Sequence, residues 1–271
     1  MMATAGREPE SGVAPVDRHT AQVCDSFVGD DPRARDVLQA AVRHLHAFVT
    51  EVGLTREEWR AGIDFLTAVG QRCDEVRQEF ILLSDTLGVS MLLEMVNAAP
   101  PVGASEPTVL GPFFVDDAAE CANGASVVSD PTTGGEALVL SGRVTDIEGR
   151  PVAGAAIDVW QVQPSGRYDI EDDPARRNLR GRLRTTPDGA FRFTTVRPVD
   201  YTIPDDGPVG SLLRSSGRHA WRPAHVHFRI TADGYEPLVT HLFDRASPYL
   251  DSDAVFAVRS SLVADMSGPE C

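Results

Sequence analysis

A histidine pair in the last third of the sequence is the first candidate for chemistry. From Ala224 to Ile230 apolar and polar residues alternate, which is the period of a half-buried β-strand. His225 and His227 therefore share one face of that strand, about 6.6 Å apart at the backbone. Two imidazoles at this spacing can converge on one metal ion, but the motif alone is a weak signal that more often marks a plain polar strand face. A metal site needs further ligands from elsewhere in the chain.

Two of the four tyrosines follow predicted strands. Tyr168 lies in a glycine-containing loop after the strand predicted over 156–163, and Tyr201 lies in a proline-rich loop after the strand predicted over 190–196. β-Sandwiches place their functional groups in such loops at strand ends. Both tyrosines are therefore candidates for functional side chains.

The first third of the chain is predicted to be helical. Asp31 followed by proline and the Thr55/Glu58 pair are caps for two helices whose apolar residues recur at helical spacing. Two further apolar segments run over about 75–87 and 90–97, and Gly88 is a natural helix end between them. So much apolar surface without strands needs a partner, which is the following domain or a second subunit.

After a linker over 98–107 the pattern changes to short runs of β-branched and aromatic residues separated by turn signals. These predicted strands cover 138–145, 156–163, 190–196, 224–231 and 238–243, and residues 253–266 form a last helix or an edge element. The sequence therefore predicts an α+β protein, with an N-terminal helical dimerisation region followed by a mainly antiparallel β-sandwich. The predicted boundaries are a disordered tail over 1–17, a helical and linker domain over 18–105, and the sandwich over 106–271.

Composition restricts the class of protein. The 271 residues are 42% hydrophobic and 24% charged, as in globular domains, and 40 acidic against 25 basic residues argue against a nucleic-acid or anionic membrane surface. Four widely spaced cysteines and the absence of a run of about 18 apolar residues favour a soluble, cytoplasmic protein with reduced thiols and no membrane insertion.

Several motifs together resemble the intradiol ring-cleaving dioxygenases over about residues 75–263. In the sheet region they are Leu140-Ser-Gly-Arg-Val-Thr-Asp, Ala156-Ile-Asp-Val-Trp-Gln, Gly166-Arg-Tyr-Asp, Phe191-Arg-Phe-Thr-Thr-Val, Tyr201-Thr-Ile-Pro and Arg222-Pro-Ala-His-Val-His-Phe. In the helical region they are Arg77-Gln-Glu-Phe-Ile-Leu-Leu-Ser-Asp-Thr-Leu-Gly-Val-Ser and Thr108-Val-Leu-Gly-Pro-Phe-Phe.

The resemblance implies one non-haem Fe(III) per subunit, held by Tyr168, Tyr201, His225 and His227. This set suits the metal, because a hard trivalent cation favours anionic oxygen donors and imidazole suits iron. The resemblance also implies that Tyr201 takes up a substrate proton and that Arg222 lies over the substrate ring, where a fixed cation stabilises developing negative charge. Many catechol-cleaving relatives carry Gln where this chain has His241, which we do not expect to be a ligand.

The same resemblance gives an expected substrate pocket. Its residues are Leu82, Asp85, Val109, Leu110, Gly111, Pro112, Phe113, Ile203, Pro204, Arg222 and Val255. A buried Asp85 carboxylate would pair with an extra hydroxyl and penalise substrates that lack it, which favours a trihydroxybenzene over catechol, unless Asp85 only caps its helix. The Leu-Ser-Asp-Thr-Leu-Gly-Val-Ser stretch resembles the hydroxyquinol 1,2-dioxygenase branch. The expected reaction is therefore cleavage of hydroxyquinol (benzene-1,2,4-triol) with O2 to 3-hydroxy-cis,cis-muconate (maleylacetate), and the alternative is a catechol or substituted-catechol 1,2-dioxygenase.

Two other classes of protein compete with this interpretation. A metal-free binding module of sandwich architecture has no reason to keep both tyrosines and both histidines at these spacings, and a ferrous two-histidine-one-carboxylate oxygenase lacks a candidate acid beside the histidine pair. The expected partners are a small aromatic diol or triol and O2. The resemblance further implies a homodimer through the N-terminal helices, and it permits a bound lipid at the dimer seam.

Overall fold

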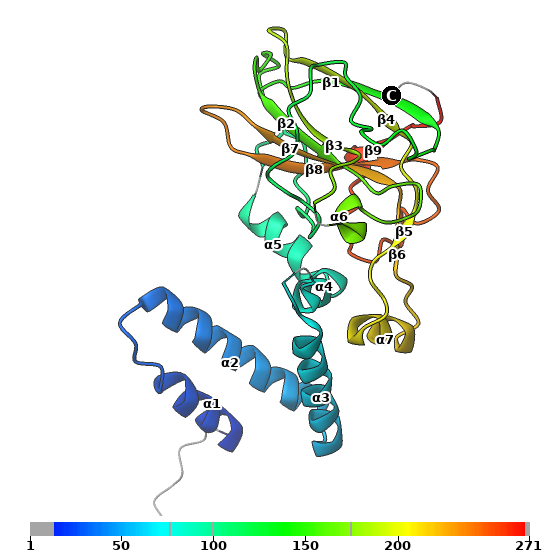
Figure 1. Ribbon diagram of the computed structural model, residues 1–271. Helices are drawn as coiled ribbons and strands as arrows, with labels where there is room; N and C mark the ends of the chain where they lie inside the picture. Colours follow the sequence, from blue (N-terminus) through cyan, green and yellow to red (C-terminus); the bar gives the residue numbers. More distant parts are fainter. Residues whose placement is uncertain (1–13, 76, 99, 174, 269–271) are drawn as a thin grey trace, which may run out of the picture. The chain divides into compact units, whose positions relative to one another are not determined.

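The protein divides into two compact units, which are residues Met1–Leu66 and Thr67–Cys271. The computed structural model, drawn in Figure 1, describes residues 14–75, 77–98, 100–173 and 175–268. Helix α3 (Arg56–Arg72) runs across the boundary between the two units. Among the described residues, no helix combines the length and the apolar character that a membrane span requires.

The first unit is helical and begins with α1 (Pro15–Asp25) and α2 (Pro32–Val52). The Asp31 side chain accepts hydrogen bonds from the backbone amides of residues 33 and 34, which confirms the predicted helix start. At the start of α3, the Glu58 amide donates to the Thr55 hydroxyl and the Glu58 carboxylate accepts from the Thr55 amide, as a capping box requires.

The predicted N-terminal tail lies mostly outside the described residues. Of positions 1–17, residues 1–13 are not described, and Pro15 already begins α1. Helix α1 is tied to α2 by a hydrogen bond from Gln39 Nε2 to the Cys24 carbonyl (3.0 Å). Six apolar side chains of α2 are exposed to solvent; they are Val37, Leu38, Leu45, Phe48, Val49 and Val52.

The second unit opens with two short helices, α4 (Glu79–Thr86) and α5 (Val89–Asn97). Gly88 lies between them with φ at +73°, a left-handed conformation that glycine adopts at no steric cost. Helix α4 begins four residues later than the pattern predicts, because Gln78 is its N-terminal cap. Most of α5 is apolar and exposed, including Leu92, Leu93, Met95 and Val96.

The rest of the second unit is a β-sandwich with short helical insertions. A five-stranded sheet has the order β3-β2-β7-β8-β9, strands β1 and β4 form a two-stranded sheet, and β5 and β6 form a second two-stranded sheet. The strands are β1 (Ala137–Arg143), β2 (Ala156–Trp160), β3 (Arg180–Arg184), β4 (Ala190–Val196), β5 (Tyr201–Thr202), β6 (Trp221–Arg222), β7 (His225–Thr231), β8 (Leu238–Asp244) and β9 (Val263–Ala264). The remaining elements are α6 (Asp169–Asp172), α7 (Pro208–Ser215) and a 3₁₀ turn over Ser260–Leu262.

The hydrophobic core contains side chains from both sheets. Val226 and Phe228 of β7 pack with Leu138 and Leu140 of β1 and are at most 3% exposed. Burying one side chain of this kind contributes about 1.5–3 kcal/mol. The predicted alternation of β7 is thereby confirmed, because the residues between these core positions, His225 and His227, belong to the opposite face.

The strand β3 was not predicted from the sequence, because its Arg-Gly-Arg-Leu-Arg composition is unlike a buried strand. Leu183 fills the core, while Arg180 and Arg182 are neutralised by the buried carboxylates of Asp169 and Asp158. The C-terminal segment is an edge element rather than a helix, since β9 pairs in parallel with β8. The other paired strands are antiparallel, as predicted.

Candidate metal and substrate site

Four ring-bearing side chains meet at the end of the sandwich beside the paired strands β5 and β6. Strand β7 presents His225 and His227, and Tyr201 lies on β5 directly opposite Arg222 of β6. Tyr168 comes from the loop before α6, which Figure 1 shows near β5 and β6. All four rings are buried, with exposed fractions between 0 and 5%.

The polar atoms of these side chains form one cluster. The Tyr168 hydroxyl lies 3.3 Å from the Tyr201 hydroxyl and 3.0 Å from His227 Nε2, and His227 Nε2 lies 3.1 Å from His225 Nε2. Two atoms that bind one ion at about 2.1 Å and at right angles lie about 3.0 Å apart. The spacing of the cluster is therefore that of ligands around a single ion.

The backbone fixes the protonation of His225. Its Nδ1 lies 2.6 Å from the Pro223 carbonyl, which accepts a hydrogen bond and cannot donate one. The proton of a neutral His225 is therefore on Nδ1, and Nε2 presents a lone pair to the cluster. A carbonyl that orients the second nitrogen in this way is the usual partner of a metal-binding histidine.

Burial also favours the neutral form of both histidines. Desolvation is the main cause that holds the pKa of His225 and His227 well below the usual value, and the Arg222 charge acts in the same direction. Desolvation, followed by the neighbouring Tyr201, raises the pKa of the Tyr168 phenol well above its usual value. A cation at the centre of the cluster would reverse that preference, because it stabilises phenolate. The donor set therefore fits a bound metal.

The loop that carries Tyr168 is held by charged groups. The Tyr168 amide donates to Glu171 (2.7 Å), and the buried Asp169 pairs with Arg180, whose Nε lies 2.7 Å from Oδ2. Asp169 also accepts from the Asn178 amide (2.8 Å). These contacts fix the start of α6 and with it the tyrosine ring.

His241 of β8 is a third buried imidazole beside the pair. Single nitrogen atoms of His225, His227 and His241 all lie within 4.8 Å of one another. His241 is opposite His227 in the sheet, and its Nδ1 is hydrogen-bonded to the Thr108 hydroxyl. Its Nε2 has no hydrogen-bond partner within the part of the chain that the structure describes. His241 therefore lies next to His227 but, among the described residues, makes no hydrogen bond to either tyrosine hydroxyl.

Arg222 brings a positive charge to the cluster. Its Nη1 donates to the Tyr201 hydroxyl (3.3 Å) and lies 3.4 Å from His225 Nε2. Burial works against a guanidinium charge, yet the attraction of Asp253 and Tyr201 raises the pKa of Arg222 above its usual value. Arg222 is therefore a permanent cation in a buried site.

A cavity of about 670 Å³ opens beside the cluster, and Tyr201 lies in its wall. Six residues of the expected substrate pocket line it: Leu82, Asp85, Pro112, Phe113, Ile203 and Pro204. Val109, Leu110, Gly111, Arg222 and Val255 are not in the cavity wall. Gly111 nevertheless lies against the cluster, because a Cβ at this position would be 3.2 Å from His227 Cε1.

Asp85 combines burial with a nearby charge. It is 8% exposed on α4, and desolvation raises the pKa of its carboxyl, while a hydrogen bond from Ser90 and the Arg222 charge oppose this shift. An apolar wall with one carboxylate can select substrates by the size of the ring and by a polar substituent on it.

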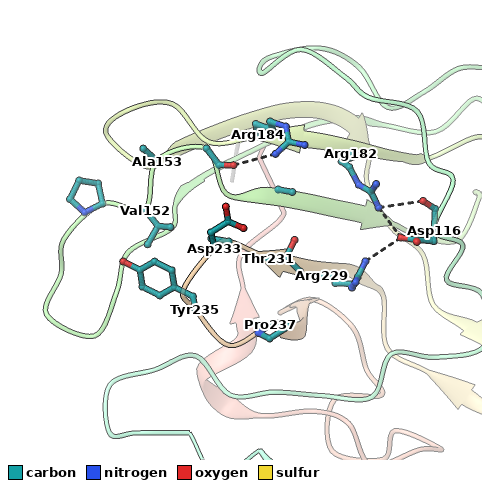
Figure 2. A pocket seen from close by; sticks show the side chains of 14 residues that line it. Asp116, Val152, Ala153, Arg182, Arg184, Arg229, Thr231, Asp233, Tyr235 and Pro237 are labelled. Atoms are coloured by element: carbon teal, nitrogen blue, oxygen red, sulfur yellow. Dashed lines mark hydrogen bonds and ion pairs between the residues drawn. The ribbon is translucent and has the colours of Figure 1, made fainter.

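A second cavity, of about 700 Å³, lies on the outer side of β3 and β7 and is shown in Figure 2. Its arginines are already paired: Arg182 and Arg229 both contact Asp116 and Asp158. It contains neither the histidines nor the tyrosines of the cluster. We therefore place the candidate functional site at the cavity that includes Tyr201.

Three further side chains support the cluster; sequence reasoning missed Asp253 and Thr108, and interpreted Trp160 as a packing or positioning residue. Asp253 pairs with Arg222, Thr108 bonds His241, and the Trp160 ring stacks on His227 with centroids 4.6 Å apart. The stacking partner of Trp160 follows from the sheet, because β2 pairs with β7 and places Trp160 opposite His227. Asp253 and Thr108 lie far from their partners in sequence, and no local pattern indicated them.

A buried cluster of two phenols and two imidazoles at one end of a β-sandwich fits the binding of a single metal ion. Comparison with known protein families identifies the class of protein to which the chain belongs. Residues 109–270 match the family model described as dioxygenase, and residues 31–105 match the one described as catechol dioxygenase N terminus. The chain belongs to the intradiol ring-cleavage dioxygenase family.

Individual relatives agree with the family. The chain is 53% identical over 241 residues to 6-chlorohydroxyquinol 1,2-dioxygenase of Cupriavidus pinatubonensis, which covers 88% of this chain and 87% of the relative. It is 51% identical over 243 residues to hydroxyquinol 1,2-dioxygenase of a Rhizobium species, covering 89% and 82%. The solved structure of hydroxyquinol 1,2-dioxygenase from Pseudomonas putida DLL-E4 superposes with a TM-score of 0.87 at 51% identity, covering 92% of this chain and 87% of that one.

Proposed function

We propose that this protein is an Fe(III)-dependent dioxygenase that cleaves hydroxyquinol between its adjacent hydroxyl carbons with O2, giving 3-hydroxy-cis,cis-muconate. The observation that carries the proposal is the buried cluster of Tyr168, Tyr201, His225 and His227, with polar atoms 3.0–3.3 Å apart. The relatives named for hydroxyquinol and 6-chlorohydroxyquinol support this substrate class.

The ligand set favours Fe(III) over other metals. Two phenolate oxygens suit a hard trivalent cation, and two neutral imidazoles complete a set that is typical of iron. When bound, the iron would supply Lewis-acid chemistry that makes the diol hydroxyls more acidic. We propose one iron per subunit.

The protein's own groups would receive protons and orient the ring. Tyr201 lines the cavity and its oxygen lies 3.3 Å from Arg222 Nη1, so we expect it to accept a substrate proton beside a fixed cation. Arg222 would stabilise negative charge on the bound ring, because its position in a dry site needs no reorganisation. Leu82, Phe113 and Ile203 give the ring an apolar wall that excludes water.

Asp85 would select the substrate by its third hydroxyl. Its carboxyl lines the same cavity on α4 and is largely removed from water. Pairing with a ring hydroxyl would relieve the cost of burying it, and a catechol ring would leave it without that partner. Substrates that lack the third hydroxyl should therefore react less well.

The test is a visible absorption spectrum of the purified iron-loaded protein under anaerobic conditions, titrated with benzene-1,2,4-triol and, separately, with catechol. We expect a broad tyrosinate-to-iron band that shifts on adding a diol, at a lower concentration for the triol. Tyr168→Phe should weaken or abolish the band, and Tyr235→Phe, an exposed tyrosine in the wall of the second cavity, is the matched control. A protein that stays colourless after ferric reconstitution would overturn the proposal. A stronger response to catechol would assign the catechol alternative.

We also propose a homodimer formed through the helices. The support is the exposed apolar surface of α2 and α5, which exceeds what isolated surface residues explain. A lipid at such a seam and a cytoplasmic location stay predictions. Cys24, Cys73 and Cys121 are free thiols, as a reducing compartment allows.

A further inference from the structure

A buried ion pair lies behind the metal cluster. Arg222 and Asp253 have side chains that are 5% and 2% exposed. Arg222 Nε lies 3.1 Å from Asp253 Oδ1, and Nη2 lies 3.5 Å from Oδ2, so the carboxylate faces one edge of the guanidinium. Because both groups are buried, removing one leaves the other charge without compensation.

The third nitrogen of the guanidinium points the other way. Arg222 Nη1 is the atom that approaches the Tyr201 hydroxyl and His225 Nε2, at 3.3 and 3.4 Å. A guanidinium is planar, so holding its Nε and Nη2 on one edge also fixes the direction of Nη1. The Asp253 carboxylate therefore determines where the cation meets the site.

Asp253 is itself held in place by the backbone. Its Oδ1 accepts from the Val255 amide (3.3 Å), and its Oδ2 accepts from the Ala257 amide (3.0 Å). The next residue, Ala254, donates its amide to the Trp221 carbonyl (3.1 Å), which joins the loop to strand β6 beside Arg222. The carboxylate thus has a fixed position before it meets the arginine.

A second arginine, Arg218, also binds the loop that carries Asp253. Arg218 Nη1 donates to the Thr86 carbonyl at the end of α4 (2.5 Å), and Nη2 donates to the Ala254 carbonyl (2.9 Å). Its guanidinium also covers the Phe256 ring, 4.7 Å from the centroid. Phe256 has φ at +59°, an unfavourable conformation for a non-glycine residue that persists only where surrounding contacts impose it.

We propose that Asp253 is a positioning residue for the ring-cleavage reaction: it holds Arg222 by Nε and Nη2, so that Nη1 faces the substrate oxygen next to Tyr201. The proposal rests on the proposed function, because Arg222 acts only if a diol binds at the cluster. Asp253 does not line the substrate cavity. Its contact with the site is the ion pair with Arg222, and, besides desolvation, its charge also raises the pKa of the Asp85 carboxyl.

The competing explanation is that Asp253 only caps its own loop through the Val255 and Ala257 amides. The two explanations differ in a double-mutant cycle. If Asp253 acts through Arg222, its removal has no further effect once Arg222 is gone. If it only caps the loop, the two losses add.

The experiment compares iron-loaded Asp253→Asn, Arg222→Gln and the double variant with the wild-type enzyme, using benzene-1,2,4-triol. We expect Asp253→Asn to lower kcat about 100-fold, as for loss of one preorganised donor, with a much smaller change in KM. The double variant should match Arg222→Gln within about twofold. Asp251→Asn, an exposed acid in the same loop, is the matched control and should leave kcat unchanged.

A spectroscopic readout separates positioning from loop capping. Arg222 Nη1 donates to the Tyr201 oxygen, so losing this donor raises the energy of the phenolate electrons and moves the tyrosinate-to-iron band to longer wavelength. We expect this shift, without added diol, in Arg222→Gln and in Asp253→Asn, and not in Asp251→Asn. A loop cap alone would leave the band of Asp253→Asn in place.

Two more variants distinguish the loss of positioning from a folding defect. Asp253→Ser keeps a hydroxyl acceptor for the loop amides and should show the same loss as Asp253→Asn. Arg222→Lys leaves Asp253 and its loop intact and keeps the charge, but it cannot make the two-point contact, so it should also lose activity. Additive losses, an unshifted band in Asp253→Asn or a fully active Arg222→Lys would each overturn the positioning role. A wild-type protein without the band would instead overturn the Fe(III) site and the positioning role together.

Discussion

At the scale of single residues, the site depends on contacts that exclude a side chain or a proton from the cluster as much as on the ligand side chains themselves. Gly111 has φ at +77° and passes close to the His227 ring, so the backbone occupies the space that a side chain would need. His225 is likewise restricted, since the Pro223 carbonyl prevents its Nε2 from carrying the proton. These two constraints leave the imidazole nitrogens free for a metal.

Replacing Gly111 with Ala should therefore weaken metal binding. The new Cβ would lie 3.2 Å from His227 Cε1 and would also suffer from the positive φ. We expect a loss of about 1–2 kcal/mol in stability, together with a lower iron content, measured by thermal unfolding and by metal analysis. Gly103→Ala is the control, because its φ is +94° but nothing lies within 4 Å. Equal iron content in both variants would remove the steric role of Gly111.

The raised pKa of Asp85 gives a prediction for stability against pH. Because desolvation raises this pKa in the folded state, the carboxyl favours folding below its unfolded pKa of about 3.9, and this contribution is lost as pH rises through the folded pKa. Asp85→Asn should thus be more stable than the wild type at neutral pH, and the difference should shrink as pH falls.

Urea unfolding at several pH values from neutral pH down to about pH 4, close to the unfolded pKa, measures this difference. Asp233→Asn, an exposed acid on the β7–β8 turn, serves as the control for a general charge effect. A stability difference for Asp85→Asn that does not vary with pH would contradict the assignment. The same variant should lower kcat/KM for benzene-1,2,4-triol more than for catechol, and an equal loss on both would remove its role in selection.

At the scale of elements, α6 is held by one buried ion pair. Asp169 and Arg180 have side chains that are 0 and 2% exposed, and they connect the Tyr168 loop to β3. Asp169→Ala should cost about 3–5 kcal/mol, because it leaves a buried arginine uncompensated, and it should also release iron. Arg143→Gln breaks the exposed pair with Asp188 and should cost less than about 1 kcal/mol. Denaturant unfolding and metal analysis of both variants provide the comparison, and similar costs would show that burial does not matter here.

The strands that were predicted correctly are those in which hydrophobic residues recur with a regular period. Strand β7 alternates clearly, and β4 was predicted with its observed bounds, because hydrophobic residues repeat with period two. Strand β3 was missed because its arginines are neutralised by Asp158 and Asp169, which are distant in sequence. The tyrosine and histidine positions followed from motifs, whereas Asp253 depends on a tertiary contact that no local pattern encodes.

At the scale of the whole molecule, the exposed apolar surface predicts self-association. Leu92 and Leu93 of α5 are each 57% exposed, and the apolar positions of α2 are similarly open. Leu92→Glu combined with Leu93→Glu should convert a dimer to a monomer, because two charges in an apolar interface are not compensated. Sedimentation equilibrium of the wild type and of this variant measures the change, and Ile147→Glu, an exposed apolar residue in a turn of the sandwich, is the control. A monomeric wild-type protein would contradict the dimer.

The position of α4 has a consequence for how this enzyme could acquire a new substrate. Its eight residues supply Leu82 and Asp85 to the cavity, while the proposed iron ligands all lie beyond residue 167, on other elements. The part of ring selection that depends on Leu82 and Asp85 is therefore encoded in a stretch of the gene separate from the proposed metal ligands. A library confined to the codons of α4 would vary ring selectivity while every member retains the same iron ligands.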